Sequence, residues 1–247
     1  KVQRVAGAAR DEADRFVLTR LFTRPLLSTT LACTLICIGA LFAFWGVTTW
    51  TPQNIREVVA ADGVTGAGAV SAVAWGTTML NVGGIIGYTT WGFIAEKIGR
   101  KRTYLMSITV GLVSVCILYP FGHTFTMYMW LLPVVGFGVF GVLSGNAVYF
   151  PELFGPSVRA SAMAVTNSIG RLCTAAGPLV AGLIATSWFG GSIAMATTVV
   201  SALIVVSLIG LMRLPETHGQ FVHGEIPPPE AAVSDPGAST VSGRTKS

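Results

Sequence analysis

The sequence predicts an all-α membrane protein with six transmembrane helices, and three observations carry this prediction. Of the 247 residues, 52% are hydrophobic and only 11% are charged, against roughly 25% charged residues in soluble domains. Six apolar stretches are each long enough to cross ~30 Å of hydrocarbon at about 1.5 Å per helical residue. The charged residues, with the exception of Arg171, lie outside these stretches, as the cost of charge in hydrocarbon requires.

The six spans follow one another with short connections. The first is expected to stop at Pro52, because proline lacks the N–H that continues a helix. Pro120, Pro133 and Pro178 are expected to end or kink their helices, with neighbouring helices satisfying the freed backbone groups. We place the spans near residues 26–50, 70–93, 103–121, 125–149, 160–187 and 192–212.

Three regions divide the chain. Residues 1–25 read as a cytoplasmic linker, 26–213 as the six-helix transmembrane domain and 214–247 as a disordered cytoplasmic tail rich in Pro, Ser, Gly and Thr. The sequence begins with Lys1 instead of Met, which indicates a fragment.

The basic residues predict how the helices are oriented. Residues 92–102 carry four cations in a short connection between two apolar stretches, and short loops this basic stay on the cytoplasmic side. Excluding Arg171, fourteen of the fifteen remaining Lys and Arg residues fall in segments on that side. We therefore expect an integral protein of the plasma (inner) membrane with both termini cytoplasmic. The net charge of +5 is explained by anionic lipid headgroups, without a nucleic-acid partner.

The residue types favour neither an enzyme nor a metal or cofactor site. The cysteines lie in apolar runs with no His or acid nearby to complete a metal site, so they read as buried thiols. Ser144 stands in Gly-Val-Leu-Ser-Gly, one residue away from the Gly-x-Ser-Gly pattern of a rhomboid-type protease. The predicted spans contain no Asp pair for an aspartyl protease, and no nucleotide motif is present.

Three motifs stand at predicted cytoplasmic helix ends. Gly92-Phe-Ile-Ala-Glu-Lys-Ile-Gly-Arg-Lys-Arg102 resembles the G-x-L-A-D-R-x-G-R-[KR] signature of the major facilitator superfamily. Tyr149-Phe-Pro-Glu-Leu-Phe-Gly-Pro-Ser-Val-Arg-Ala160 resembles the P-E-L-F-P-[ST]-x-[VL]-R-A segment of sugar porters and metabolite:proton symporters. Leu214-Pro-Glu-Thr-His-Gly219 is similar to the closing P-E-T-K-G motif, with His in place of Lys. The motifs occur in the order and at the spacing of that superfamily.

This resemblance implies the C-terminal half, helices 7–12, of a twelve-helix transporter. Such a half resembles two three-helix repeats related by inversion, here near 26–121 and 125–212. It implies alternating-access transport of a small solute: an organic acid, a sugar or a related metabolite. The first span lacks the paired glutamines of sugar porters, so a hexose is less favoured. The predicted spans hold no Asp, Glu or His, so coupled protons would be handled by the missing N-terminal half.

The resemblance also implies a cytoplasmic gate. In sugar-porter relatives, acids and arginines at this membrane face form an inner latch that stabilises the state open to the outside. The matching candidates here are Glu96 with Arg100, Glu152 with Arg159, and Glu216. Breaking one such pair is expected to shift the conformational balance by about 1 kcal/mol.

Arg171 is the candidate centre of a substrate site. It lies eleven residues after Ala160, about 16 Å along a helix and so near the bilayer midplane, where a cation costs roughly 2.5–3.5 kcal/mol. We hypothesise that it pairs with a substrate carboxylate or with an acid of the missing half. Asn167 and Asn81 would add hydrogen bonds and Trp45 would line the cavity. The alternative is a structural arginine bonded to backbone carbonyls.

Other interpretations stay open at this point. The chain could be a truncated or half-size unit that needs a partner half, a six-helix channel or a membrane enzyme. Because six helices supply only one wall of a substrate path, the fragment alone is expected not to transport.

Overall fold

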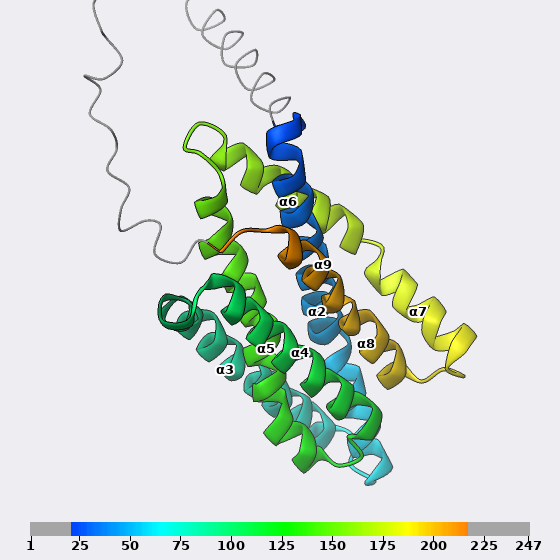
Figure 1. Ribbon diagram of the computed structural model, residues 1–247. Helices are drawn as coiled ribbons and strands as arrows, with labels where there is room; N and C mark the ends of the chain where they lie inside the picture. The colour runs from blue at the N-terminus through cyan, green and yellow to red at the C-terminus, as the bar shows by residue number, and fades with distance from the viewer. Residues whose placement is uncertain (1–20, 217–247) are drawn as a thin grey trace, which may run out of the picture.

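The computed structural model describes residues 21–216, and all regular secondary structure in this range is helical. Six segments are long and apolar enough to span a membrane, as the sequence predicts. Most of the predicted linker (1–25) and of the predicted tail (214–247) lies outside the described residues. The elements are α2 (Arg24–Ala61), α3 (Ala67–Ile98), α4 (Arg100–Phe121), α5 (Phe125–Leu153), α6 (Arg159–Thr174), α7 (Gly177–Trp188), α8 (Ile193–Ala202), the 3₁₀ turn η1 (Leu203–Val205) and α9 (Val206–Arg213) (Figure 1).

The first helix does not stop at Pro52, so that prediction is wrong. α2 continues through Pro52 to Ala61. Proline inside a helix costs about 3 kcal/mol, but the extra turns are packed: Ile55 and Val59 are 0% and 3% exposed. Asn54 adds side-chain hydrogen bonds to the Trp50 carbonyl and to Thr197 of α8. The burial of Ile55 and Val59 and the hydrogen bond to Thr197 are tertiary contacts that offset the missing backbone hydrogen bond.

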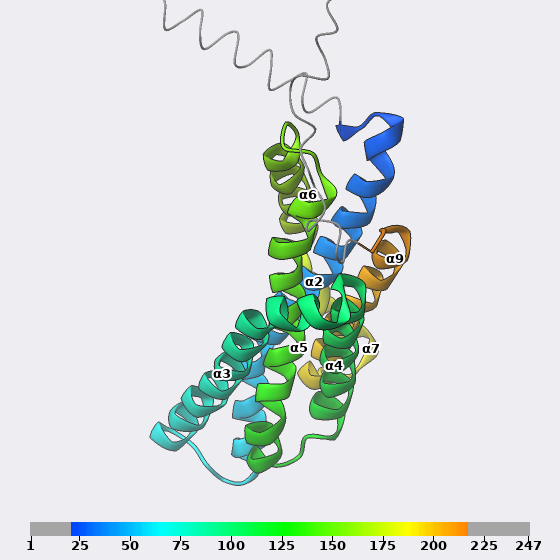
Figure 2. The same cartoon turned by 60° about the vertical axis from the view of Figure 1, so that its left-hand side comes forward.

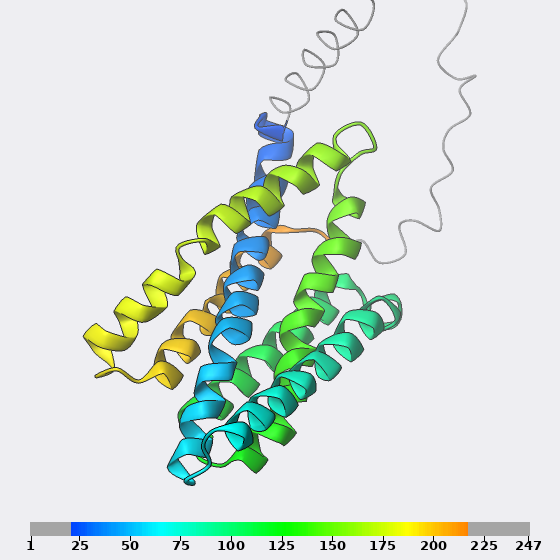
Figure 3. The same cartoon turned by 180° about the vertical axis from the view of Figure 1, so that it is seen from behind.

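The fifth span is broken near its middle. Instead of one helix over 160–187, α6 ends at Thr174 and α7 begins at Gly177. Pro178 has no N–H to donate to the carbonyl four residues earlier, at Thr174, so the helical ladder is interrupted there. Seen from behind, α6 crosses α2, and α7 continues beyond α2 as a separate segment (Figure 3). The kink predicted from Pro178 is confirmed, and it places a non-helical turn in mid-span.

The packing relates the chain's two three-helix units. α5, the first helix of the second unit, packs against α3 and α4 of the first unit. In the same way α2, the first helix of the first unit, packs against α6, α7, α8 and α9 of the second. The first helices also contact each other, as do α4 and α8. Each unit therefore completes its hydrophobic contacts only with the other, as expected for paired repeats.

Glycines let α3 and α5 approach each other closely. A Cβ placed on Gly83 or Gly87 would collide with the carbonyl oxygen of Pro133 or Phe137 on α5. Small residues four apart allow such backbone contact in lipid, where helix association depends on van der Waals packing. Gly83 and Gly87 therefore allow the backbones of α3 and α5 to touch.

The start of α4, the end of α5 and the segment after α9, which carry residues of the three sequence motifs, lie near one another (Figure 2). The predicted loop at 94–102 is helical except at Gly99, whose φ of 99° is a conformation that favours glycine. α3 thus ends and α4 begins around a single residue. This turn brings the basic start of α4 beside the ends of α5 and α9.

Candidate functional site

A cavity of about 780 Å³ lies among α2, α3, α5 and the broken α6–α7 segment. It is large enough for a small metabolite, since ligand pockets run from about 300 to 1,000 Å³. Its wall is mostly apolar, with a few polar groups. The lining residues are Leu41, Phe44, Trp45, Tyr88, Leu143, Asn146, Ala147, Met163, Asn167, Arg171, Thr174, Ala175 and Pro178.

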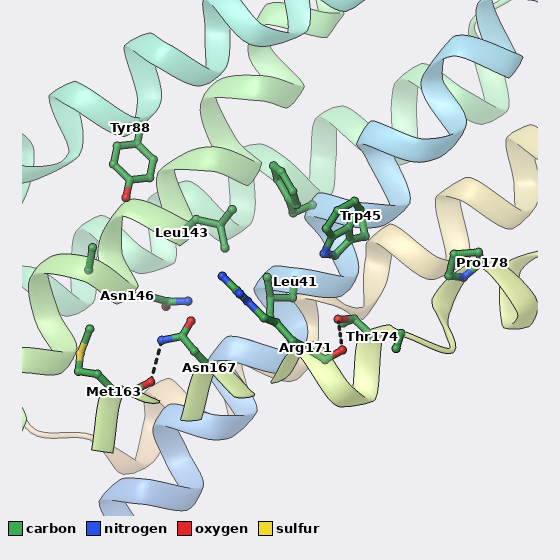
Figure 4. Close-up of a pocket in the computed structure, with 13 residues that line it drawn as sticks. Leu41, Trp45, Tyr88, Leu143, Asn146, Met163, Asn167, Arg171, Thr174 and Pro178 are labelled. Atoms are coloured by element: carbon green, nitrogen blue, oxygen red, sulfur yellow. Dashed lines mark hydrogen bonds between the residues drawn. The ribbon is translucent and has the colours of Figure 1, made fainter. Parts of the chain in front are cut away.

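Arg171 lies in the last turn of α6, directly before the helix break, and its side chain extends into the cavity (Figure 4). Its backbone carbonyl accepts hydrogen bonds from the Ala175 N–H and the Thr174 hydroxyl. The guanidinium makes no ion pair or hydrogen bond with residues 21–216. Arg171 is exposed towards this mostly apolar cavity. Within the described residues its guanidinium is therefore not the structural arginine bonded to backbone carbonyls that the alternative supposed.

Asn167 and Trp45 also line this cavity. Asn167 is one turn before Arg171, and its Nδ2 donates to the Met163 carbonyl at 2.9 Å. Its Oδ1 accepts a 3.6 Å hydrogen bond from the thiol of Cys37 on α2. Trp45 is 50% exposed and gives the cavity a flat aromatic wall. The three side chains come from two helices that are far apart in sequence.

Asn81 does not join this group. It lies on an exposed face of α3, where its Nδ2 donates to the Thr77 carbonyl at 2.7 Å, and it is absent from the cavity wall. The residue of α3 that reaches the cavity is Tyr88, seven residues later. Seven residues are two turns, about 10 Å, so Asn81 is on a similar face but at the wrong depth.

Asn146 of α5 also lines the cavity, although it was not among the residues predicted from the sequence. Figure 4 shows its amide pointing towards Asn167 and Arg171. The signal was available, because Asn146 is an isolated carboxamide in an apolar stretch, as Asn81 and Asn167 are. Their positions in the sequence could not predict which of these three asparagines lie together in the cavity.

A second polar site lies where the three motifs meet. Arg100 at the start of α4 forms an ion pair with Glu152 near the end of α5, with Nη2 to Oε1 at 3.0 Å and Nε within 3.3 Å of both carboxylate oxygens. The two side chains are only 15% and 13% exposed. Glu216, after α9, accepts hydrogen bonds from the backbone N–H groups of Arg100 and Lys101 at 2.9 and 3.2 Å.

The predicted pairs, Glu96 with Arg100 and Glu152 with Arg159, are therefore wrong. Glu96 is exposed and has no ion pair within the described part of the chain. Arg159 donates from Nε to the Phe154 carbonyl at 3.3 Å and not to Glu152. The turn at Gly99 explains the difference, because it ends α3 and begins α4, so that Arg100 is directed away from Glu96 and across to α5.

Glu216 is held in place by its neighbours. The hydroxyl of Tyr149 on α5 donates to the Pro215 carbonyl, and a Cβ on Gly99 would lie 3.1 Å from the Glu216 carboxylate. The carboxylate sits at the positive N-terminal end of α4, where negative charge is favoured. The cluster of Arg100, Glu152 and Glu216 thus joins α4, α5 and the segment after α9.

Comparison with known families identifies the chain. The sequence model described as Major Facilitator Superfamily matches residues 60–236. The chain belongs to this superfamily. The family predicted from the three motifs is thereby confirmed.

Two relatives among the known proteins come from Acinetobacter baylyi. The cis,cis-muconate transport protein is 29% identical over 163 residues, which are 65% of this chain and 36% of that protein. The niacin transporter NiaP is 26% identical over 153 residues, covering 59% of this chain and 31% of that transporter. The matched region thus spans about a third of the length of each relative.

Proposed function

We propose that this chain is the C-terminal half, helices 7–12, of a secondary transporter that moves a small organic anion across a membrane by alternating access. The observation that carries the proposal is the guanidinium of Arg171, which extends into a mostly apolar cavity and has no ion pair or hydrogen bond with residues 21–216. A cation at mid-span costs roughly 2.5–3.5 kcal/mol and usually serves a substrate or ion path. A carboxylate of the substrate would compensate that charge.

The rest of the cavity suits an organic acid. Trp45 and Phe44 form an aromatic corner, with ring centroids 5.5 Å apart, against which a planar carbon skeleton packs. Asn146 and Asn167 add amide groups beside Arg171. Muconate and niacin, which name the two relatives, are both carboxylates, so the relatives support the same chemistry.

The remaining parts of the proposal follow if this chain is one half of a transporter. A partner of six helices would supply the other wall of the cavity and, if transport is coupled to protons, the titrating acid. The six helices form the transmembrane domain, and residues 1–25 and 214–247 flank it in the cytoplasm of a plasma (inner) membrane protein. The cluster of Arg100, Glu152 and Glu216 would then lie at the cytoplasmic boundary as a latch.

Replacement of Arg171 tests the proposal. In the complete transporter, R171Q should weaken nicotinate or cis,cis-muconate binding by about 10- to 100-fold, because a charge-assisted hydrogen bond contributes about 1.5–3 kcal/mol. R171K should retain part of the affinity. The matched control is R213Q, since Arg213 is an exposed arginine at the end of α9.

Binding is measured by isothermal titration calorimetry on purified protein. Equal affinity of the wild type and R171Q for every carboxylate would refute the proposed role of Arg171. Transport of an uncharged solute alone would refute the organic-anion assignment.

A further inference from the structure

A buried tyrosine donates a hydrogen bond to the side-chain amide of Asn146, a residue of the cavity wall. The hydroxyl of Tyr104 on α4 donates to Asn146 Oδ1 at 2.9 Å, and Tyr104 is 0% exposed. Asn146 Nδ2 makes no hydrogen bond with the residues that the structure describes. It is also not among the fully enclosed polar atoms of these residues that lack a partner. With the oxygen occupied on the protein side, the N–H donors of Asn146 are left to the cavity.

We propose that Tyr104 is a positioning residue that aims the amide N–H of Asn146 at an acceptor oxygen of the ligand. The inference rests on the proposed function, because it assigns that oxygen to the carboxylate bound by Arg171. The asparagine would be a specificity residue in direct contact with the ligand. The tyrosine would act only through it.

The Tyr104 ring is fixed by close packing between helices. A Cβ on Gly145, the residue before Asn146, would lie 2.8 Å from Tyr104 Cε1 and 2.8 Å from Trp91 Cζ2. The two rings meet edge to face, with centroids 5.1 Å apart and an interplanar angle of 75°. A side chain at 145 would displace Tyr104, so glycine there is what allows the hydroxyl to reach Asn146.

The charged cluster holds the same two helices in register. One turn before Tyr104 on α4, Arg100 pairs with Glu152 on α5. Tyr104 and Asn146 therefore form a second, neutral link between these helices, one turn deeper. The two links are four residues apart on α4 and six residues apart on α5, so together they leave α4 little freedom to rotate or slide against α5.

The consequence for specificity concerns donors and acceptors. An amide free to rotate can present either N–H or C=O to a ligand. When Tyr104 occupies the oxygen, Asn146 presents donors only, and it stands beside a guanidinium that also has donors only. This arrangement favours a carboxylate, with acceptors at both oxygens, over the isosteric carboxamide, whose NH₂ would meet donors.

The test compares nicotinate with nicotinamide, which differ only in that group. Dissociation constants are measured by calorimetry on the complete transporter, and thermal unfolding verifies that each variant is folded. In Y104F the ring stays and the hydroxyl is lost, so Asn146 can rotate and accept from the carboxamide. The preference for nicotinate over nicotinamide should then fall about three- to tenfold, the effect of one hydrogen bond.

Tyr119 is the matched control. It lies on the same helix, is 2% exposed and shares a hydrogen bond with Thr51, outside the cavity wall. Y119F removes the same atom and should leave the preference unchanged. N146A should lower the preference as Y104F does, and Y104F should have no further effect in an N146A background, because the two residues act as a unit.

An unchanged preference in folded Y104F would overturn the inference even if R171Q abolishes nicotinate binding, and the proposed function would then stand. If Y104F does not fold, the same measurement is made on N146A, and an unchanged preference for nicotinate over nicotinamide in that variant would overturn the inference. If the wild type binds no carboxylate, the proposed function fails and this inference fails with it.

Discussion

Glu216 and Glu96 lie on either side of the Gly99 turn, and only the removal of Glu216 should destabilise the protein. Glu216 accepts from the backbone N–H groups of Arg100 and Lys101 at the start of α4. Glu96 is exposed in the last turn of α3, where the negative end of the helix dipole disfavours an acid. The comparison is between E216A and E96A.

The magnitude follows from the two hydrogen bonds. Removing a helix N-cap acceptor costs about 0.5–2 kcal/mol, and the charge at the dipole adds about 0.3–1 kcal/mol. Because Glu216 is exposed, screening by water reduces both contributions, and we expect a loss of about 1–2 kcal/mol for E216A. E96A should be neutral or stabilise by about 0.3 kcal/mol.

Thermal unfolding of the purified protein in detergent measures this difference. For a protein of this size 1 kcal/mol corresponds to about 2–4 °C in Tm, so E216A should lower Tm by about 3–6 °C. In 1 M salt the shift should shrink, because the screening length falls to about 3 Å. Equal shifts for E216A and E96A would refute the assignment of Glu216 as the cap of α4.

Two further predictions concern packing and orientation. G83A should destabilise the protein by about 1–3 kcal/mol, because the new methyl group collides with the Pro133 carbonyl. On the same helix, a methyl group at Gly92 meets nothing within 4 Å, so G92A should stabilise the protein by up to about 1 kcal/mol. Equal Tm values for the two variants would contradict the α3–α5 contact. The orientation is tested in a background in which the four native cysteines are replaced by serine. R102C should react with a membrane-impermeant maleimide only in inside-out vesicles, and T65C should react only in right-side-out cells. The reverse pattern would place the basic turn outside the cell.

Much of the site follows from residue type and position along the chain. Distance along a helix is a product of residue number and rise, so the sequence alone places Arg171 in mid-span, Asn167 one turn away on the same face, and the three motifs at helix ends. The superfamily is also readable there, because the motif residues are local. None of these inferences needs to know which helix lies beside which.

Partners across helices required the tertiary structure. Arg100 pairs with Glu152 instead of Glu96, and Asn146 enters the cavity instead of Asn81, because helix rotation and depth are set by glycine contacts such as Gly83 with Pro133. α2 likewise runs through Pro52 because Ile55 and Val59 are buried by other helices. The sequence by itself determined how many helices cross the membrane and which ends carry charge. Packing decided which side chains meet, since that free energy belongs to several distant segments at once.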